Sequence, residues 1–499
     1  MLPTVENHAH FMVDRRQCIV FFEQFPAITT DRCDLGHVTI DVLPDDVLLF
    51  MFDFYLARAS KVEAWHTLVH VCRRWRITVF GSPRRLKLRI KCTGDIPPRE
   101  KLDIWPALPI VISGKCYSTT SFNNIKAILK HRDRVCRIKL GLIDLEEEIL
   151  AALEEPFPVL RFLKIYSNGT LVPMFPNPDK FLGGSNHLRL LSLTGISIPE
   201  LLPKLLLSST NLVVLRLKEI PIFAFVPPDE MVTALSALTR LQVLHLEPKF
   251  DELRTHPNPD WENRRLPLPT PTVLPSLIVL KFKGVIEYLE DLMARIDAPI
   301  LNRLDIVVII LDQVIVLNVP QTFRFISNVP KFRALDEAHI GMDIDNVDIW
   351  IKFLSTQKSS DMLKLQVLCI EPEGRFPILA QFCCSPVSPL PTLENLYIDG
   401  GTYSSQRWRV HTENAGWLEL LRPFTSVKNL YVSEEFAPCI PPALEEIAGD
   451  IVTEVLPALE SLFLEEFNTS GAAREAIGKF AAARALSGHP IAVSQWDRW

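Results

Sequence analysis

Residues 188–193 read LRLLSL, residues 212–217 read LVVLRL and residues 241–246 read LQVLHL. Each stretch carries apolar residues at its first, fourth and sixth positions and a polar residue at its fifth. The alternation at the end of each stretch has the period of a β-strand with one buried face. The pattern therefore predicts short strands that present their polar residues on a common side.

The same stretch recurs along the chain, with successive starts 24 to 36 residues apart. This spacing is typical of leucine-rich repeats at their long, irregular end. Each repeat buries its apolar face only against its neighbours, so the units should stack into a solenoid. The further stretches are VCRIKL (135–140), LRFLKI (160–165), LIVLKF (277–282), LNRLDI (301–306), FRALDE (332–337, degenerate), LQVLCI (365–370), LENLYI (393–398), VKNLYV (427–432) and LESLFL (459–464).

Helices are expected between these strands, at residues 199–207, 229–238, 289–296, 347–354, 417–421 and 443–455. The predicted fold class is therefore α/β: a curved solenoid with parallel strands on its concave face and helices on its convex face. We assign residues 134–471 to the solenoid, with a Pro-rich and charged surface insertion at about 250–275. Residues 84–133 connect to it and hold its first strands, beginning at Leu86, Leu88 and Ile90. Residues 472–499 form a capping helix and strand.

The segment before the solenoid has a helical rather than an alternating pattern. Residues 1–38 show no clean period and form an N-terminal extension. Residues 39–83 predict a short three-helix module, in which Pro44 fits a helix start and two acids follow in the first turn. Val47, Leu48, Met51, Phe52 and Tyr55 then form one apolar stripe. Because so short a module buries little surface alone, a partner would cover the rest of the stripe.

This module resembles the F-box motif, a family pattern of LPxE-V-L-x-x-I-F followed by L-x-x-V-C-R-x-W. The matching stretches here are LPDDVLLFMFDFYL (43–56) and WHTLVHVCRRWRITVF (65–80), with Asp46 in place of the usual Glu. The whole layout resembles the large fungal, basidiomycete-type group of F-box proteins with divergent leucine-rich repeats. The matching residues are Leu43, Pro44, Val47, Leu48, Phe52, Leu68, Val71, Cys72, Arg74 and Trp75.

The resemblance implies a non-enzymatic role. F-box proteins dock the Skp adaptor of a cullin-RING ubiquitin ligase and present a protein substrate on a C-terminal domain. The residues that would make or support the adaptor interface here are Leu43, Pro44, Val47, Leu48, Phe52, Leu68, Val71, Cys72 and Trp75. Two alternatives remain open: these residues form only an internal core, or the chain is a scaffold outside any ligase whose F-box-like helices cap the solenoid.

The polar positions of the strands predict a second surface. The concave face should be basic in its first half and acidic in its second, where three aromatic residues follow one another. We expect a protein target to bind there through the aromatic side chains, oriented by the charges. A solvated face without function is the alternative. The expected target-binding residues are Lys164, Arg216, Lys218, Lys281, Lys283, Tyr397, Asp399, Tyr431 and Phe463.

Composition and charge give no reason to expect binding to nucleic acid or to an anionic membrane. The sequence has 499 residues and a net charge of −6, so no global charge attracts polyanions. Its ten cysteines form no CxxC pair, which favours free thiols in a reducing compartment. The N-terminus lacks a signal-peptide pattern and no apolar run is long enough for a membrane span. We therefore expect a cytoplasmic or nuclear location.

Catalytic, cofactor and metal motifs are not found in the sequence. His66 and His70 have zinc-helix spacing, but HTLVH lacks the Glu of HExxH. Residues 343–348 lack the Gly of a calcium loop and better fit the acidic first turn of a helix. The basic cluster at 73–91 could contact phosphates but better fits a solvated face or a partner contact. No GxSxG, GxxxxGK[ST] or GxGxxG sequence occurs, so we expect neither enzyme activity nor a cofactor.

Overall fold

The computed structural model describes residues 40–59, 61–142, 146–167, 182, 187–196, 201–221, 226–249, 270–310, 319–343, 348–356, 362–369, 380–383, 393–400, 414–436, 439–446, 453–465 and 471–496. The predicted N-terminal extension at 1–38 and most of the predicted insertion at 250–275 lie outside the described residues. The chain divides into two compact units, Met1–Lys87 and Leu88–Trp499.

The described part of the first unit is a helical module. A short 3-10 turn, η3 (Ile40–Val42), precedes α1 (Asp45–Arg58), α2 (Trp65–Val69) and α3 (Arg73–Gly81). Pro44 precedes α1, whose first turn holds Asp45 and Asp46, where acids favour the helix dipole. The core of the module is apolar and consists of Leu48, Leu49, Phe52, Trp65, Leu68, Val69 and Val79.

The second unit is built on one large sheet, in which sixteen strands of the described residues are ordered β1-β2-β3-β4-β5-β6-β7-β9-β11-β14-β13-β12-β15-β16-β17-β18. Neighbouring strands are parallel except around β13, which is antiparallel to both β12 and β14. The fold class is therefore α/β, as predicted. The strands are β1 (Ile90–Cys92), β2 (Ile110–Lys115), β3 (Val135–Leu142), β4 (Phe162–Ser167), β5 (Leu190–Thr194), β6 (Val214–Ile220), β7 (Val243–Pro248), β9 (Val279–Gly284), β11 (Arg303–Ile310), β12 (Glu337–Asp343), β13 (Asp348–Leu354), β14 (Met362–Cys369), β15 (Asn395–Gly400), β16 (Asn429–Val432), β17 (Ser461–Leu464) and β18 (Ala492–Gln495), with a separate pair of β8 (Thr272–Val273) and β10 (Ile296–Asp297).

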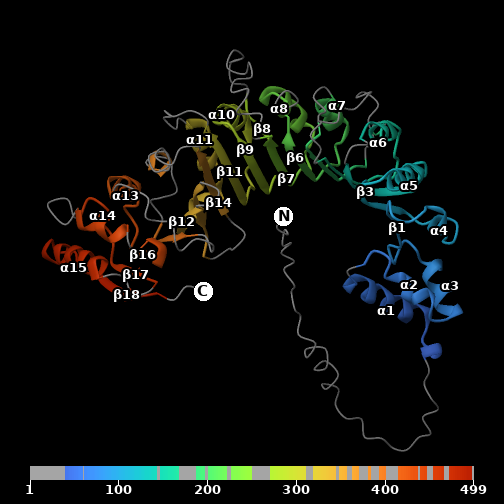
Figure 1. Cartoon of the computed structure of the whole chain (residues 1–499), viewed down its shortest axis with the longest axis horizontal. Coiled ribbons are helices and arrows are strands. Elements are labelled where there is room, and N and C mark those ends of the chain that lie inside the picture. Colours follow the sequence, from blue (N-terminus) through green and yellow to red (C-terminus); the bar gives the residue numbers. More distant parts are fainter. Residues whose placement is uncertain are drawn as a thin grey trace, which may run out of the picture. The chain divides into compact units, whose positions relative to one another are not determined.

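Helices lie along one side of this sheet (Figure 1). Parallel strands need a crossover connection, and the segments between successive strands supply it. The helices are α4 (Arg99–Leu102), α5 (Thr119–Leu129), α6 (Glu146–Ala152), α7 (Leu201–Ser208), α8 (Pro228–Ser236), α10 (Ile286–Arg295), α11 (Pro320–Asn328), α13 (Asn414–Leu421), α14 (Ile440–Glu446) and α15 (Gly471–Leu486), with 3-10 turns η7 (Pro330–Ala334) and η10 (Glu434–Phe436).

The framework leucines of the repeated stretch stack in register across the sheet. Leu191 pairs with Leu215, and Leu215 pairs with Leu244. All three are fully buried. Because successive side chains of a strand point to opposite faces, the residue after each framework leucine lies on the other face of the sheet. We call this second face the open face and define it by Lys164, Arg216, Lys281 and Tyr431.

The helix predicted at residues 347–354 is wrong, because β13 (Asp348–Leu354) occupies this segment. The segment alternates strictly: Ile349, Ile351 and Phe353 are fully buried, whereas Trp350 and Lys352 are half-buried on the other face. A period of two in β-branched and aromatic residues favours a strand. Strand β13 lies between β12 and β14 and accounts for the two antiparallel pairs in an otherwise parallel sheet.

Two of the predicted repeat stretches have the wrong frame. FRALDE (332–337) is not a strand, because η7 occupies Pro330–Ala334 and β12 begins only at Glu337. In LQVLCI (365–370), the residue that stacks on the framework leucine Leu304 is Leu363 rather than Leu368. Lys364 therefore takes the open-face position beside Asp305. On β12 the corresponding position belongs to His339 and not to Asp336, the fifth residue of FRALDE. At the start of the sheet, β1 begins at Ile90, after Leu86 and Leu88.

Candidate functional site

Helix α1 carries an exposed apolar stripe. Val47, Phe50, Met51, Phe54 and Tyr55 follow the spacing i, i+3, i+4, i+7, i+8 and are 41% to 69% exposed. Leu48, Leu49 and Phe52 on the same helix point into the core of the module. The helix is therefore apolar on two sides, and only the side with Leu48, Leu49 and Phe52 is buried inside the module. A contiguous exposed apolar surface marks an interaction site. We call these five exposed residues the α1 stripe.

The residues expected at an adaptor interface divide between the core and the surface. Leu48, Phe52 and Leu68 are buried, so they support the module rather than contact a partner. Pro44, Val47 and Val71 are exposed, and Leu43, Cys72 and Trp75 are half-buried. Phe50 and Phe54 are missing from the expected set, although the helical period through Val47 and Met51 includes them.

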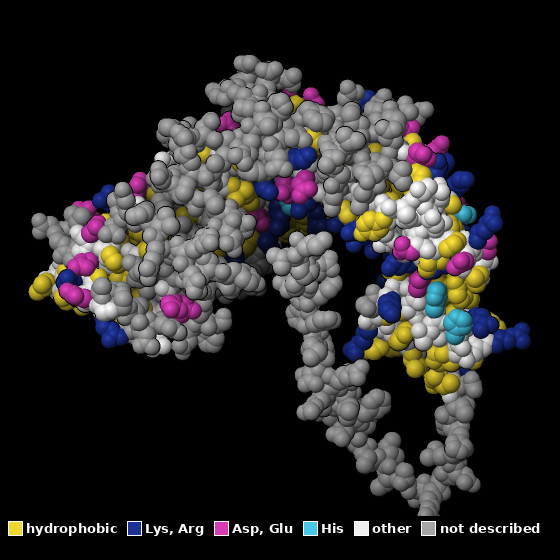
Figure 2. Space-filling view, in the orientation of Figure 1, with side chains coloured by type: hydrophobic (Ala, Val, Ile, Leu, Met, Phe, Trp, Pro, Cys, Tyr) yellow, Lys and Arg dark blue, Asp and Glu magenta, His cyan; other side chains and the backbone are white. Residues whose placement is uncertain are grey.

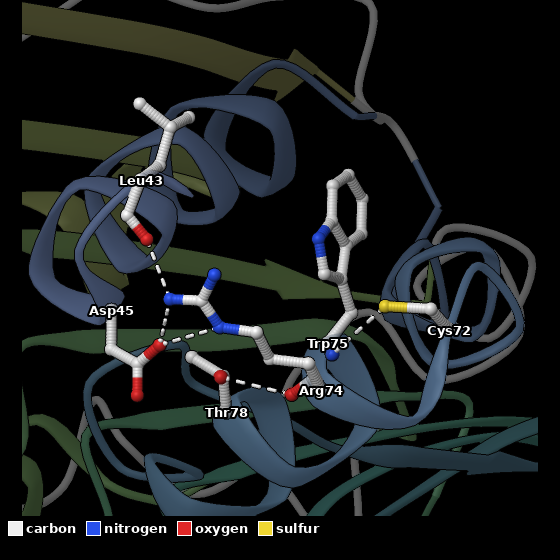
Figure 3. A network of polar contacts seen from close by, with 6 residues as sticks. All are labelled: Leu43, Asp45, Cys72, Arg74, Trp75 and Thr78. Carbon is white, nitrogen blue, oxygen red and sulfur yellow. Dashed lines mark hydrogen bonds and ion pairs between the residues drawn. The ribbon is translucent and has the colours of Figure 1, made fainter. Parts of the chain in front are cut away.

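A polar network joins α3 to the start of α1 (Figure 3). The guanidinium group of Arg74 donates to the carboxylate of Asp45 from Nη2 at 2.7 Å and to the carbonyl oxygen of Leu43. Cys72 caps α3, since its Sγ accepts from the backbone N–H of Trp75 at 3.4 Å. The Trp75 ring packs on Phe52 with centroids 4.7 Å apart. Through these contacts, Arg74 and Trp75 of α3 hold the first turn and the buried side of α1.

Part of the basic cluster at 73–91 is used inside the module. Besides Arg74, the guanidinium of Arg76 donates to the carbonyl oxygen of Val69 at 3.0 Å. Arg85 lies 3.9 Å from the Asp46 carboxylate. The contacts of Arg74 and Arg76 lie within the module, so fewer cations of the cluster remain for a phosphate-binding surface.

All nine residues expected to bind a target lie on the open face, but they are spread from β4 to β17. Six of them belong to one row of residues that pair in register from strand to strand: Lys164, Arg216, Lys281, Tyr397, Tyr431 and Phe463. The whole row runs Ser113, Lys139, Lys164, Ser192, Arg216, His245, Lys281, Asp305, Lys364, Lys352, His339, Tyr397, Tyr431, Phe463 and Ser494. Lys218, Lys283 and Asp399 lie two residues further along their strands. Lys352 and Lys364 make the second half less acidic than predicted. In Figure 2, dark blue Lys and Arg side chains gather in the hollow beneath the helices of this unit, with magenta acidic side chains among them.

Acidic side chains neutralise the middle of the open face. Glu247 is held by Lys283 at 2.9 Å, His245 at 3.4 Å and Lys218 at 3.6 Å. Lys281 lies 3.1 Å from the Asp305 carboxylate. Burial alone would raise the pKa of Glu247, but the hydrogen bonds from His245 and Lys283 and the nearby lysine charges outweigh it and lower that pKa to about 2.

The aromatic residues of the open face stack on one another. Ring centroids lie 4.5 Å apart for His339 and Tyr397, 4.2 Å for Tyr397 and Tyr431, and 4.5 Å for Tyr431 and Phe463. Trp496 lies edge-on against both tyrosine rings. We call the stacked rings of His339, Tyr397, Tyr431 and Phe463 the ring ladder. Much of the aromatic surface of the ring ladder is therefore in contact within the chain, and target binding by Tyr397, Tyr431 and Phe463 stays a prediction.

Carboxylates surround the histidine end of the ring ladder. The imidazole of His339 lies 2.8 Å from Glu337 and 3.3 Å from Asp399. Burial opposes its charged form, but hydrogen bonds and charges from both carboxylates outweigh burial and raise the pKa of His339. His339 therefore links the two carboxylates to the stacked rings.

Within the described ranges, no group of three or more His, Cys, Asp or Glu side chains could hold a metal ion. No helix in the part of the chain that the structure describes combines the length and apolar character needed to cross a membrane. Compared with known proteins, the chain matches no protein-family model, and no curated protein matches it significantly.

Proposed function

We propose that this chain is a substrate-recognition adaptor of an SCF-type cullin-RING ubiquitin ligase. Its helical module would act as an F-box that docks the Skp adaptor, and through it the cullin scaffold. The sheet of the second unit would act as a leucine-rich-repeat solenoid whose open face binds a protein target. This role needs neither catalysis nor a cofactor, and it fits a cytoplasmic or nuclear location.

The α1 stripe is the observation that carries the proposal. Large apolar side chains exposed at helical spacing cost solubility unless a partner covers them, and aromatic and methionine side chains are enriched at protein interfaces. The stripe lies in the segment whose sequence resembles the F-box motif. The polar network of Arg74 supports the same proposal, because it fixes the start of the helix that carries the stripe.

Co-expression of the full chain with the Skp adaptor and the cullin scaffold tests this proposal. The chain should co-purify the adaptor, and it should co-purify the cullin only when the adaptor is present. The alternative, a repeat scaffold whose helices only cap the solenoid, predicts capture of neither protein. Cullin capture without the adaptor would contradict the proposed order of assembly.

A further inference from the structure

Cations of three strands line up at one end of the open face. Lys139 on β3 pairs in register with Lys164 on β4, and Ser192 on β5 separates Lys164 from Arg216 on β6. We call Lys139, Lys164 and Arg216 the basic row. Ser192 is short and buried, and the long side chains of Lys164 and Arg216 lie on either side of it. Lys218 lies two residues beyond Arg216 but is not part of the row, because its ammonium group lies 3.6 Å from the Glu247 carboxylate.

The basic row differs from the cations in the middle of the open face, because no described acidic side chain pairs with it. Lys281 and Lys283 each form an ion pair with a carboxylate of a neighbouring strand. None of the three side chains of the basic row forms an ion pair with a carboxylate of the described residues. Among the residues that the structure describes, the three positive charges of the basic row therefore have no carboxylate against them, in a chain whose net charge is −6.

The charges of the basic row repel one another. Burial lowers the pKa of Lys164, and the positive charges of Lys139, Arg216 and Lys218 lower it further. Like charges held on adjacent strands oppose folding, and a bound anion would relieve that repulsion. The arrangement is thus better suited to a charged ligand than to the isolated chain.

The length of the basic row selects the kind of anion. Neighbouring strands lie about 4.8 Å apart, so the row extends over roughly 14 Å from β3 to β6. An extended peptide places side chains of one side about 6.8 Å apart, so acidic residues at alternate positions i, i+2 and i+4 would cover this distance. Beside the row, the Tyr166 ring lies over Gly141, where any Cβ would come within 2.6 Å of it. Its ring lies against the ammonium group of Lys164.

The neighbouring acids favour a short anion over a long one. Glu247 lies on β7, the strand next to β6, and Asp305 lies on β11, two strands beyond β7. The nearest lysines beyond the row, Lys281 and Lys283, are already paired with these carboxylates, so they attract a long nucleic-acid backbone less than the basic row attracts a short acidic segment. Nucleic-acid binding also depends on many phosphate contacts in succession. The charge pattern is therefore complementary to a peptide with a few alternating carboxylates.

We infer that the basic row binds an extended acidic segment of a target protein, which crosses β3 to β6 with carboxylates at alternate residues. This inference rests on the proposed function only in that the segment belongs to the target. Its recognition is electrostatic, so affinity should fall as ionic strength rises.

Fluorescence anisotropy of a labelled peptide, with three Glu residues alternating with Ser, tests the inference on the full chain. The triple variant Lys139→Gln/Lys164→Gln/Arg216→Gln should bind the peptide roughly tenfold or more weakly, since three charge contacts are lost. The matched control is Lys126→Gln/Arg132→Gln/Lys479→Gln, which also removes three positive charges from exposed ion pairs. It should bind within about twofold of wild type.

Three results would overturn the inference. The first is no binding of the peptide by the wild-type chain at low ionic strength. The second is equal weakening by both triple variants, which would mean non-specific charge attraction. The third is displacement of the peptide by a single-stranded oligonucleotide of equal charge at lower concentration, which would assign the row to nucleic acid. Because the Skp adaptor takes no part in this measurement, its failure would leave adaptor capture intact and the two proposals separable.

Discussion

The guanidinium group of Arg74 on α3 holds the carboxylate of Asp45 at the first turn of α1, with nitrogen–oxygen distances of 2.7 and 3.1 Å. The same guanidinium also binds the carbonyl oxygen of Leu43, the last residue before Pro44. Arg74 therefore links α3 to the start of α1, although α2 lies between these two helices in the sequence. The α1 stripe begins two residues after Asp45, so this contact determines how the stripe is presented.

Replacing Arg74 should loosen α1. We expect Arg74→Ala to destabilise the module by about 1 kcal/mol. The substitution removes the partly exposed ion pair with Asp45 and the hydrogen bond to the carbonyl oxygen of Leu43. Hydrogen exchange of the backbone amides of residues 45–58 in the full chain should accelerate about fivefold. Arg85→Ala is the control, since Arg85 lies 3.9 Å from Asp46, and equal acceleration in both variants would refute a special role for Arg74.

Glu247 should stabilise the sheet in a pH-dependent manner. Its pKa falls from 4.5 to about 2 in the folded chain. A lowered folded-state pKa contributes stability that is present above the unfolded value and is lost as the pH falls from about 4.5 towards 2. Glu247→Gln should therefore cost about 1–3 kcal/mol in urea denaturation at neutral pH, and this difference should shrink at about pH 3. A pH-independent difference would show that the charge of Glu247 is not the cause.

His339 should show the opposite pH dependence. Its raised pKa means that its contribution is fully present below the unfolded-state value and is lost as the pH rises through the folded-state value. His339→Gln should therefore destabilise the chain more at about pH 6 than at about pH 9. Thermal melts at both values measure this difference, with the exposed His489→Gln as the control. A larger cost at the higher pH would contradict the assigned pairing with Glu337 and Asp399.

The sequence predicts the parallel strands well because their signal is local. Leu191, Leu215 and Leu244 occupy the same position of a recurring stretch, and the structure stacks them in register. The strand at Ile349–Phe353 is missed because the repeat leads us to expect a helix there, although its own period of two indicates a strand. The frame of LQVLCI is also ambiguous, because leucines occur at both possible inward positions.

The sites are less predictable than the strands because they depend on which face packs inward. Helix α1 is apolar almost all round, so its sequence does not distinguish the buried Phe52 from the exposed Phe50 and Phe54. The ion pair of Lys283 with Glu247 joins residues of adjacent strands that lie 36 positions apart in the chain. Its existence depends on strand register, which the repeat only approximates.

Calorimetric titration of the full chain with the purified Skp adaptor tests the central claim most directly. We predict a one-to-one complex with a Kd of about 1 µM or tighter, weakened at least about tenfold by Phe50→Asp/Phe54→Asp in the α1 stripe. Ile104→Asp/Leu486→Asp, which changes two exposed apolar residues of the second unit, should bind like wild type. Absence of binding by the wild-type chain, or equal binding by the stripe variant, would contradict the assignment of the helical module as the docking site of a ubiquitin ligase.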